Sequence, residues 1–373
     1  MKKICVLMGI LMAVLSAGNS LAAQTEVKSG MHFDYWSGDN SSKGMQLYIP
    51  IEASASMNDF SLELLGAFVY TTVDPDAGDK ESLSQMSDTK LNFSYGIHDR
   101  LPFDLLFGLG FNLPTGHTDL SASEMTLIAP PDLVSFPTFG EGFNINPSVT
   151  IAKDWGRFIA GLGAGYTWRG EYDYSYQYEN YDPGDVLTVT GEMGYDLSEA
   201  LFGKLFAQYV NYSKDTVDSN DYYQEGPVKI IGTGLNYKAK SWDLAFTLAG
   251  ILRDKSKVQD GTALPKESKN SHGDEITAGI SFRFHQNDST TYKCSSGLVS
   301  IQENDYETSS PNYIGKRQKI SLGAGMDKKF TEDTTGSFNL EGYVMNDDKN
   351  WYHPAEDVTY KGFSLSAMIS KKF

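Results

Sequence analysis

Charged residues recur on one face of many segments whose side chains alternate between apolar and polar. Apolar residues take every second position in these segments, and glycine, hydroxyl and charged residues take the others. Successive side chains of an extended strand point to opposite faces, so the charges would share one face of a sheet. Such charges could sort solutes by charge, or they could pair with one another and only fill space. The candidates for a solute-facing surface are Lys90, Asp104, Arg157, Arg169, Asp243, Arg253, Glu275 and Arg283.

Residues for catalysis or metal binding show no motif. The histidines are scattered, and neither a Gly-x-Ser-x-Gly turn nor a zinc-type cysteine spacing is present. Loops can converge in space, so a hydrolase built at the rim of the fold stays an alternative. A non-catalytic adhesin or surface scaffold is a second alternative. We expect no enzyme, no metal site and no cofactor.

The alternating segments are separated by breaks of two kinds, which follow one another in strict order. The short breaks lie near 56–59, 99–102, 154–156, 197–200, 238–241, 286–289 and 331–334. The long breaks lie near 38–42, 74–85, 114–141, 175–184, 214–225, 254–271, 302–315 and 347–356. Tight turns at one end and long loops at the other are typical of an antiparallel up-and-down barrel that crosses a membrane. The pattern predicts an all-β transmembrane barrel of about 16 strands, with about 14 as the fallback.

The two ends of the chain agree with this prediction. Lys2 and Lys3 precede an apolar stretch, and Ser20 and Ala22 follow it as small residues before a cut. Residues 1–22 are therefore expected to be a signal peptide, and residues 23–373 the barrel. The final segment alternates up to a terminal aromatic residue, Phe373.

Composition excludes some partners. The net charge is −17, and it becomes more negative when the signal peptide is removed, which argues against nucleic acid. Cys294 would be the one cysteine of the mature chain and could form no internal disulfide.

Aromatic residues cluster around one long break. Tyr166 and Trp168 end an alternating segment and fit the interfacial aromatic belt of a membrane barrel. Tyrosines continue beyond it, where such a belt is not required. They could form a rigid hairpin, which we favour, or a surface that binds sugars or aromatic compounds. These later tyrosines are Tyr172, Tyr174, Tyr176, Tyr178 and Tyr181.

The whole chain resembles bacterial outer-membrane porins and porin-like transport barrels, at the level of architecture and of the terminal Phe373. The resemblance implies that the third and longest loop, Pro114 to Glu141, folds into the lumen. Its end, Pro137-Thr138-Phe139-Gly140-Glu141, loosely resembles the Pro-Glu-Phe-Gly signature of a porin constriction loop, with Thr138 in place of the glutamate. The stretch from Asn112 to Gly116 resembles transport barrels for aromatic or fatty substrates instead. The candidate constriction residues are Glu124, Asp132, Phe136, Phe139 and Glu141.

The resemblance implies an integral protein of the outer membrane that passes small solutes by passive or selective diffusion. The alternative is a transporter of hydrophobic or aromatic molecules through a largely plugged barrel, with a side opening where Pro147 interrupts its strand. Expected partners are outer-membrane lipid, lipopolysaccharide, small solutes and the barrel-assembly machinery, which would read Phe373. A homotrimer is a further expectation.

Overall fold

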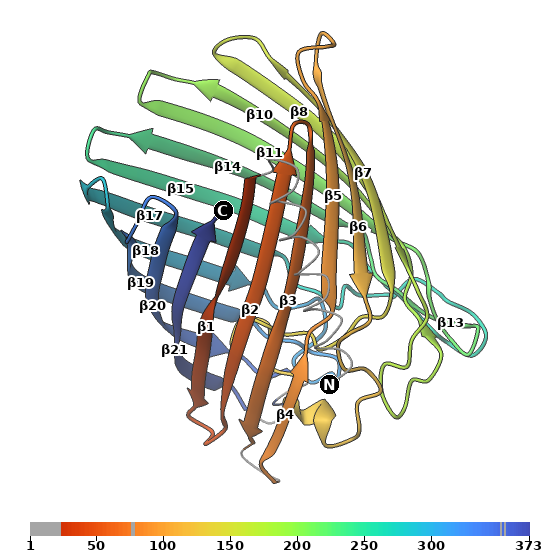
Figure 1. Cartoon of the computed structure of the whole chain (residues 1–373). Coiled ribbons are helices and arrows are strands. Elements are labelled where there is room, and N and C mark those ends of the chain that lie inside the picture. The colour runs from red at the N-terminus through yellow and green to blue at the C-terminus, as the bar shows by residue number, and fades with distance from the viewer. Residues whose placement is uncertain (1–23, 76–78, 351–352, 354–355) are drawn as a thin grey trace.

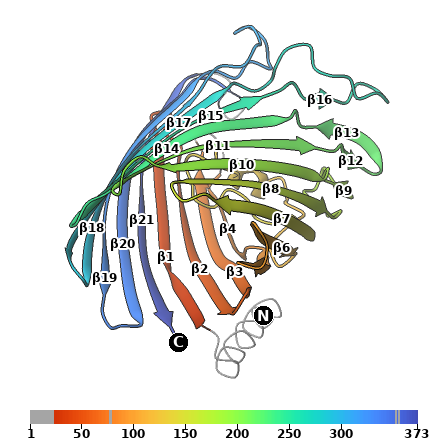
Figure 2. The same ribbon diagram turned by 90° about the horizontal axis from the view of Figure 1, so that it is seen from above.

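The computed structural model describes residues 24–75, 79–350, 353 and 356–373. The described chain forms a closed ring of antiparallel strands (Figures 1 and 2). The predicted signal peptide lies outside the described residues. Among the described residues, no helix is long and apolar enough to cross a membrane.

The strands of the ring follow one another around the wall in chain order. In that order they are β1 (Gln24–Gly38), β2 (Lys43–Met57), β3 (Phe60–Asp74), β4 (Glu81–Met86), β5 (Thr89–Ile97), β6 (Asp104–Leu113), β7 (Asn144–Asp154), β8 (Phe158–Arg169), β10 (Val186–Asp196), β11 (Leu201–Tyr212), β14 (Val228–Lys238), β15 (Trp242–Arg253), β17 (Glu275–Asn287), β18 (Thr290–Ile301), β19 (Arg317–Lys329), β20 (Thr334–Asp347) and β21 (Val358–Lys372).

The ring has 16 strand positions, because β4 and β5 both pair with β3 and share one position. It closes where β1 pairs with β21 along almost the whole length of both strands, and Figure 2 shows these two side by side. The start of β1 and the end of β21 both lie at the end of the barrel that carries the short turns (Figure 1). The prediction of an all-β antiparallel barrel of about 16 strands is confirmed. One loop is shorter than expected, because β4 continues the ladder over residues 81–86, and residues 81–85 of it fall in the predicted break 74–85.

The outer face of the wall is apolar. Leu162 on β8 is 69% exposed, Ile231 on β14 is 62% exposed and Leu322 on β19 is 67% exposed. Between such residues stand small ones, such as Gly161 and Gly163, on the opposite face. An apolar band around a closed barrel is stable in lipid, because a closed ring pairs the backbone groups of its strands with one another and leaves no open edge.

The loop between β6 and β7, residues 114–143, is here called the inner loop. It contains one short 3-10 helix, η1 (Glu124–Leu127). Its apolar residues pack against wall side chains in the main buried cluster of the barrel, which includes Leu127 and Leu133 of the loop with Trp36, Tyr343 and Met345 of the wall. The inner loop therefore supplies much of the core of the barrel.

A second, smaller sheet extends the barrel on its long-loop side. It is built from β9 (Tyr181–Asp182), β12 (Asp215–Val217), β13 (Asn220–Gln224) and β16 (Lys257–Val258). Its strands pair in the order β16-β13-β12-β9, so three long loops form one structure. The sequence did not predict this sheet.

Candidate pore constriction and vestibule

Hydrogen bonds fix the inner loop to strands β1 and β2. The Gln46 side chain donates to the Phe136 carbonyl and accepts from the Phe136 N–H, at 2.8 Å in both cases. The carboxylate of Asp34 accepts from the Ser135 N–H at 2.8 Å. Gln46 and Asp34 are each only 1% exposed, so the polar atoms of this contact are shielded from solvent.

Ionic contacts fix the same loop to β19 and β20. The Arg317 guanidinium donates two hydrogen bonds of 2.9 Å to Asp347 and one of 3.0 Å to Asp132 of the loop. The ammonium of Lys319 donates to the Asp132 carbonyl at 2.6 Å, and the Tyr343 hydroxyl donates to the Leu133 carbonyl at 3.2 Å. Paired and hydrogen-bonded charges of this kind hold a segment in one place.

Both ends of the inner loop meet at Asp88, in the break between β4 and β5. One oxygen of the Asp88 carboxylate accepts from the Gly116 N–H, and the other accepts from the Glu141 N–H, at 2.7 Å each. The second oxygen also accepts from the Asn112 side chain at 2.7 Å. A Cβ on Gly116 would lie 2.4 Å from the Phe139 carbonyl oxygen, so the loop closes on a residue without a side chain. The Asp88 carboxylate thus holds the two ends of the inner loop together.

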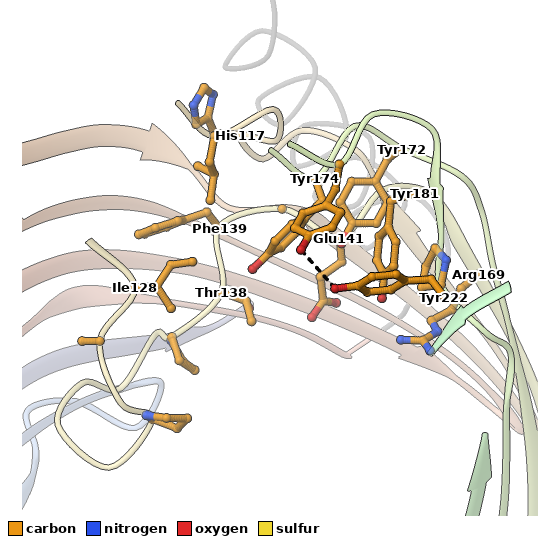
Figure 3. Close-up of a pocket in the computed structure, with 17 residues that line it drawn as sticks. His117, Ile128, Thr138, Phe139, Glu141, Arg169, Tyr172, Tyr174, Tyr181 and Tyr222 are labelled. Atoms are coloured by element: carbon orange, nitrogen blue, oxygen red, sulfur yellow. Dashed lines mark hydrogen bonds between the residues drawn. The ribbon is translucent and has the colours of Figure 1, made fainter. Parts of the chain in front are cut away.

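Between the inner loop and the following long loop lies a cavity of about 580 Å³, here called the vestibule (Figure 3). One side is made of tyrosines and Arg169, and Figure 3 shows His117, Ile128 and Phe139 of the inner loop on the other. The tyrosines are Tyr172, Tyr174, Tyr178, Tyr181 and Tyr222.

Two further cavities continue from the vestibule. The second, of about 260 Å³, shares Thr138, Phe139, Gly140 and Glu141 with it. The third, of about 460 Å³, shares Lys90, Asn112 and Glu141 with the second. Glu141 lines all three, so the three cavities form a series that passes the end of the inner loop. The chain is a transmembrane β-barrel of the outer-membrane type.

No family model and no curated protein sequence matches the chain. Solved outer-membrane barrels are similar in structure at low sequence identity. The TodX monoaromatic hydrocarbon channel has 11% identity and a TM-score of 0.46, over 94% of this chain and 90% of that one. OpdQ of Pseudomonas aeruginosa has 7% identity and a TM-score of 0.45, over 94% and 99%. An anion-selective porin from Comamonas acidovorans has 13% identity and a TM-score of 0.43, over 94% and 99%.

The charges proposed from the sequence fall into separate groups. Lys90 lines the second and third cavities, and Arg169 lines the vestibule. Asp243 lies opposite Arg283 in the β15–β17 ladder and bonds to His285 at 2.9 Å. The register continues from Arg283 through β18, β19, β20 and β21 to His32, which contacts the inner loop, so this row faces inward.

Other proposed residues are paired at the two ends of the wall. Arg253 bonds to Glu275 at 3.2 Å, and Asp104 lies 3.4 Å from His98. Arg157 stands apart, because it lies in the turn before β8. Its guanidinium donates to the carbonyls of Asp196 and Leu197 and lies 5.4 Å from the ring centre of Tyr195, whose side chain is on the outer face.

Of the proposed constriction residues, Asp132, Phe136 and Phe139 contact the wall or line the cavities, as described above. Glu124 bonds within the loop instead, to His117 at 3.2 Å and to Ser121. Burial alone would raise the pKa of Glu124, but the hydrogen bonds from Ser121 and His117 outweigh it and lower the pKa. Sequence reasoning missed Asp88, Gln46 and Asp34, because nothing in the local sequence around a single polar residue predicts which loop it will bind.

One serine, histidine and aspartate meet where the loop joins β1. The Ser135 hydroxyl lies 2.8 Å from Nε2 of His32, and Asp34 lies 3.1 Å from the same nitrogen. A catalytic triad needs the acid on the opposite ring nitrogen from the nucleophile, so that the histidine can accept a proton from the serine. The three residues here form a structural contact between loop and wall.

Proposed function

We propose that this barrel is a diffusion channel of the outer membrane, with its constriction set by the inner loop. The observation that carries the proposal is the series of three cavities beside a loop that is bonded to one side of the wall. A barrel of this size has room for an aqueous lumen unless a loop fills it. A loop held against one side narrows that lumen and leaves a passage beside it, where the second cavity lies between the loop end and strands β2, β3 and β5.

Charges at the narrowest part would select among solutes. Glu141, at the end of the inner loop, faces the passage together with Lys90 and Glu52 of the wall, and these three line the second cavity. None of the three side chains has an ion pair or hydrogen bond within the described residues. Unpaired charges of both signs along a water-filled path produce a field that acts on passing ions and dipoles. Arg283 would extend this field through the lumen, and the contacts Arg253–Glu275 and Asp243–His285 would add local dipoles to it.

The membrane partners follow from the same proposal. The apolar outer face would contact lipid, and the acidic long loops would bind lipopolysaccharide through divalent ions. The ring of Phe373 is 61% exposed at the end of the last strand, where the assembly machinery could bind it. A homotrimer remains part of the proposal.

The test is single-channel conductance of the refolded mature protein in a planar bilayer under a salt gradient. We expect stable conductance steps in wild type. In Glu141→Gln we expect the reversal potential to shift toward the value of a channel without cation preference. The matched control, Glu171→Gln, removes an exposed carboxylate of the same long-loop side and should leave the reversal potential unchanged. Silence from a folded, heat-modifiable barrel would contradict the channel.

Such silence would favour the alternative, a transporter of hydrophobic or aromatic molecules. One observation supports keeping it. The β7–β8 ladder pairs Ile145 with Trp168 and then Ser148 with Gly165, so it is interrupted at Asn146 and Pro147. The Asn146 side chain instead donates to the Thr167 hydroxyl at 2.7 Å. Uptake of an aromatic compound without ion conductance would support this alternative.

A further inference from the structure

We propose that the vestibule binds organic cations that carry an apolar or aromatic body. This proposal rests on the proposed channel function and names the class of solute that binds at the mouth of the channel. It rests on the aromatic side of the vestibule, on one unpaired carboxylate and on the absence of an equally unpaired cation among the described residues that line it.

The aromatic side is a set of packed phenol rings. Tyr172 and Tyr181 have ring centres 5.7 Å apart, Tyr174 lies 5.9 Å from Tyr181, and Tyr178 lies 5.4 Å from Tyr222. The hydroxyls of Tyr178 and Tyr222 bond to each other at 3.0 Å (Figure 3). This mutual packing fixes the rings before any ligand arrives. Aromatic faces attract cations through their quadrupole, and such cages are typical of quaternary ammonium sites.

Glu141 supplies the negative charge. Its backbone N–H is held by Asp88, but its carboxylate has no hydrogen bond or ion pair within the part of the chain that the structure describes. Figure 3 shows Glu141 between the tyrosines and Thr138. A cation that touches the tyrosines would therefore lie close to this carboxylate.

Arg169, the one arginine among the described residues that line the vestibule, is already compensated. The Arg169 side chain donates to the Gly184 carbonyl at 2.6 Å and lies 3.9 Å from the Asp215 carboxylate. Asp215 also accepts from the Tyr181 hydroxyl at 2.7 Å and from the Gly184 N–H at 2.7 Å. Since Asp215 and Arg169 neutralise each other, the charge of Glu141 is left to attract a ligand.

The phenols themselves stay neutral. Burial raises the pKa of Tyr172, and the charge of Glu141 raises it further. Burial and the neighbouring Tyr178 likewise raise the pKa of Tyr174. The rings therefore contribute their faces and not a phenolate.

The opposite side of the vestibule restricts the ligand further. Ile128, Pro131, Pro137 and Phe139 of the inner loop present carbon atoms to the tyrosines. A sugar would need polar partners for hydroxyls around its whole rim, and the side chains of these four residues carry no polar group. The alkyl or aryl substituents of an ammonium group need no hydrogen-bond partner on this side.

The experiment measures binding by calorimetry to the folded full-length mature barrel in a non-ionic polyoxyethylene detergent. Phosphocholine detergents are avoided because their headgroup is itself a quaternary ammonium. The probes are benzyltrimethylammonium and choline, with 3,3-dimethylbutan-1-ol as the neutral carbon analogue of choline and phenylacetate as the anion. We expect both cations to bind and choline to bind roughly tenfold more tightly than its neutral analogue.

Two pairs of variants test the assigned groups. Glu141→Gln should weaken benzyltrimethylammonium binding roughly tenfold, and Tyr174→Leu should weaken it roughly fivefold. The matched controls, Glu171→Gln and Tyr176→Leu, change exposed residues that do not line the vestibule and should leave binding unchanged. Equal binding of choline and its neutral analogue, or of wild type and Glu141→Gln, would overturn the proposal, as would tighter binding of phenylacetate.

Because this measurement needs no ion current, the two proposals can fail separately. Cation binding by a barrel that never conducts would remove the channel and keep the site. Conductance without cation binding would remove the site and keep the channel.

Discussion

The two halves of the barrel wall are built on the same ladder but present different inner faces. The half that runs from β19 through β21 to β3 carries large side chains, such as Trp36, Gln46 and Tyr343, and the inner loop buries them. The half that runs from β7 to β18 carries many small ones between its inward charges. Its inner rows include Gly161, Gly163, Gly165, Thr190, Gly232, Gly234, Gly279 and Gly297.

This difference determines where solutes can pass. Large side chains give the loop a surface to bind, and the loop then occupies much of that half of the lumen. Glycine and hydroxyl residues leave space, and a cavity of about 420 Å³ lies against Thr247, Gly279 and Gly297 and extends to Lys319 and Glu341 of the other half. The composition of each inner face therefore decides which half holds the loop and where the wall leaves room beside it.

Removing the loop should erase the difference between the halves. Deletion of residues 126–136 takes away η1 in part and the bonds at Asp132, Ser135 and Phe136. We expect single-channel conductance to rise about twofold or more, because the lumen of a barrel of this size is wide when no loop fills it. The measurement is the step size in a planar bilayer, for protein whose heat-modifiable migration shows a folded barrel.

The control deletion removes residues 261–263, at the exposed tip of another long loop. Its conductance should equal that of the wild type. An unchanged conductance in the 126–136 deletion would show that the inner loop does not set the constriction.

A smaller effect should follow from loosening the loop without removing it. Arg317→Met leaves the carboxylates of Asp132 and Asp347 without their shared partner. Breaking a largely buried ionic contact costs on the order of 3 kcal/mol. We expect a lower unfolding temperature and rapid fluctuations between conductance levels, read from heat-modifiability and from bilayer recordings.

Lys316→Met removes one positive charge from the adjacent position and is the matched control. It should leave both readouts unchanged. The double variant Arg317→Met with Asp132→Asn should recover part of the lost stability, because the charge that Arg317 leaves at Asp132 is gone. Fluctuations of equal size in the control would assign the effect to net charge instead of to the contact.

The barrel could be predicted from the sequence, and the interior mostly could not. Alternation along a strand is a local property, so the segments around Leu162 and Phe373 could be predicted as strands. The order of short and long breaks predicted the up-and-down topology. The contacts of Asp88 with Gly116 and Glu141 join residues far apart in the chain, and no local pattern reports them.

The tyrosines show the same limit of prediction from sequence, which misses contacts between distant segments. The sequence placed Tyr172 and Tyr174 beyond the membrane edge but favoured a plain hairpin. Their role as one side of a cavity depends on Tyr222, which joins them through the small sheet formed by β9, β12 and β13. Neighbours brought in by another loop are not visible in a single segment.

The smallest effect should come from pH, through the long loop between β20 and β21. Nε2 of His353 lies 3.0 Å from the Asp347 carboxylate, which Arg317 also binds. The ring centres of His353 and Tyr360 lie 6.2 Å apart. Burial alone would lower the pKa of His353, but the hydrogen bond and charge of Asp347 outweigh it and raise the pKa above the ordinary 6.5. A raised folded pKa means that this contribution to stability is complete below about pH 6.5 and is lost as pH rises through the folded value.

The midpoint temperature of the heat-modifiability transition should therefore fall slightly between about pH 6 and pH 9 in wild type. His353→Gln should remove that slope, and His272→Gln, in a different long loop, should retain it. A slope that persists in His353→Gln would assign the pH dependence to another group.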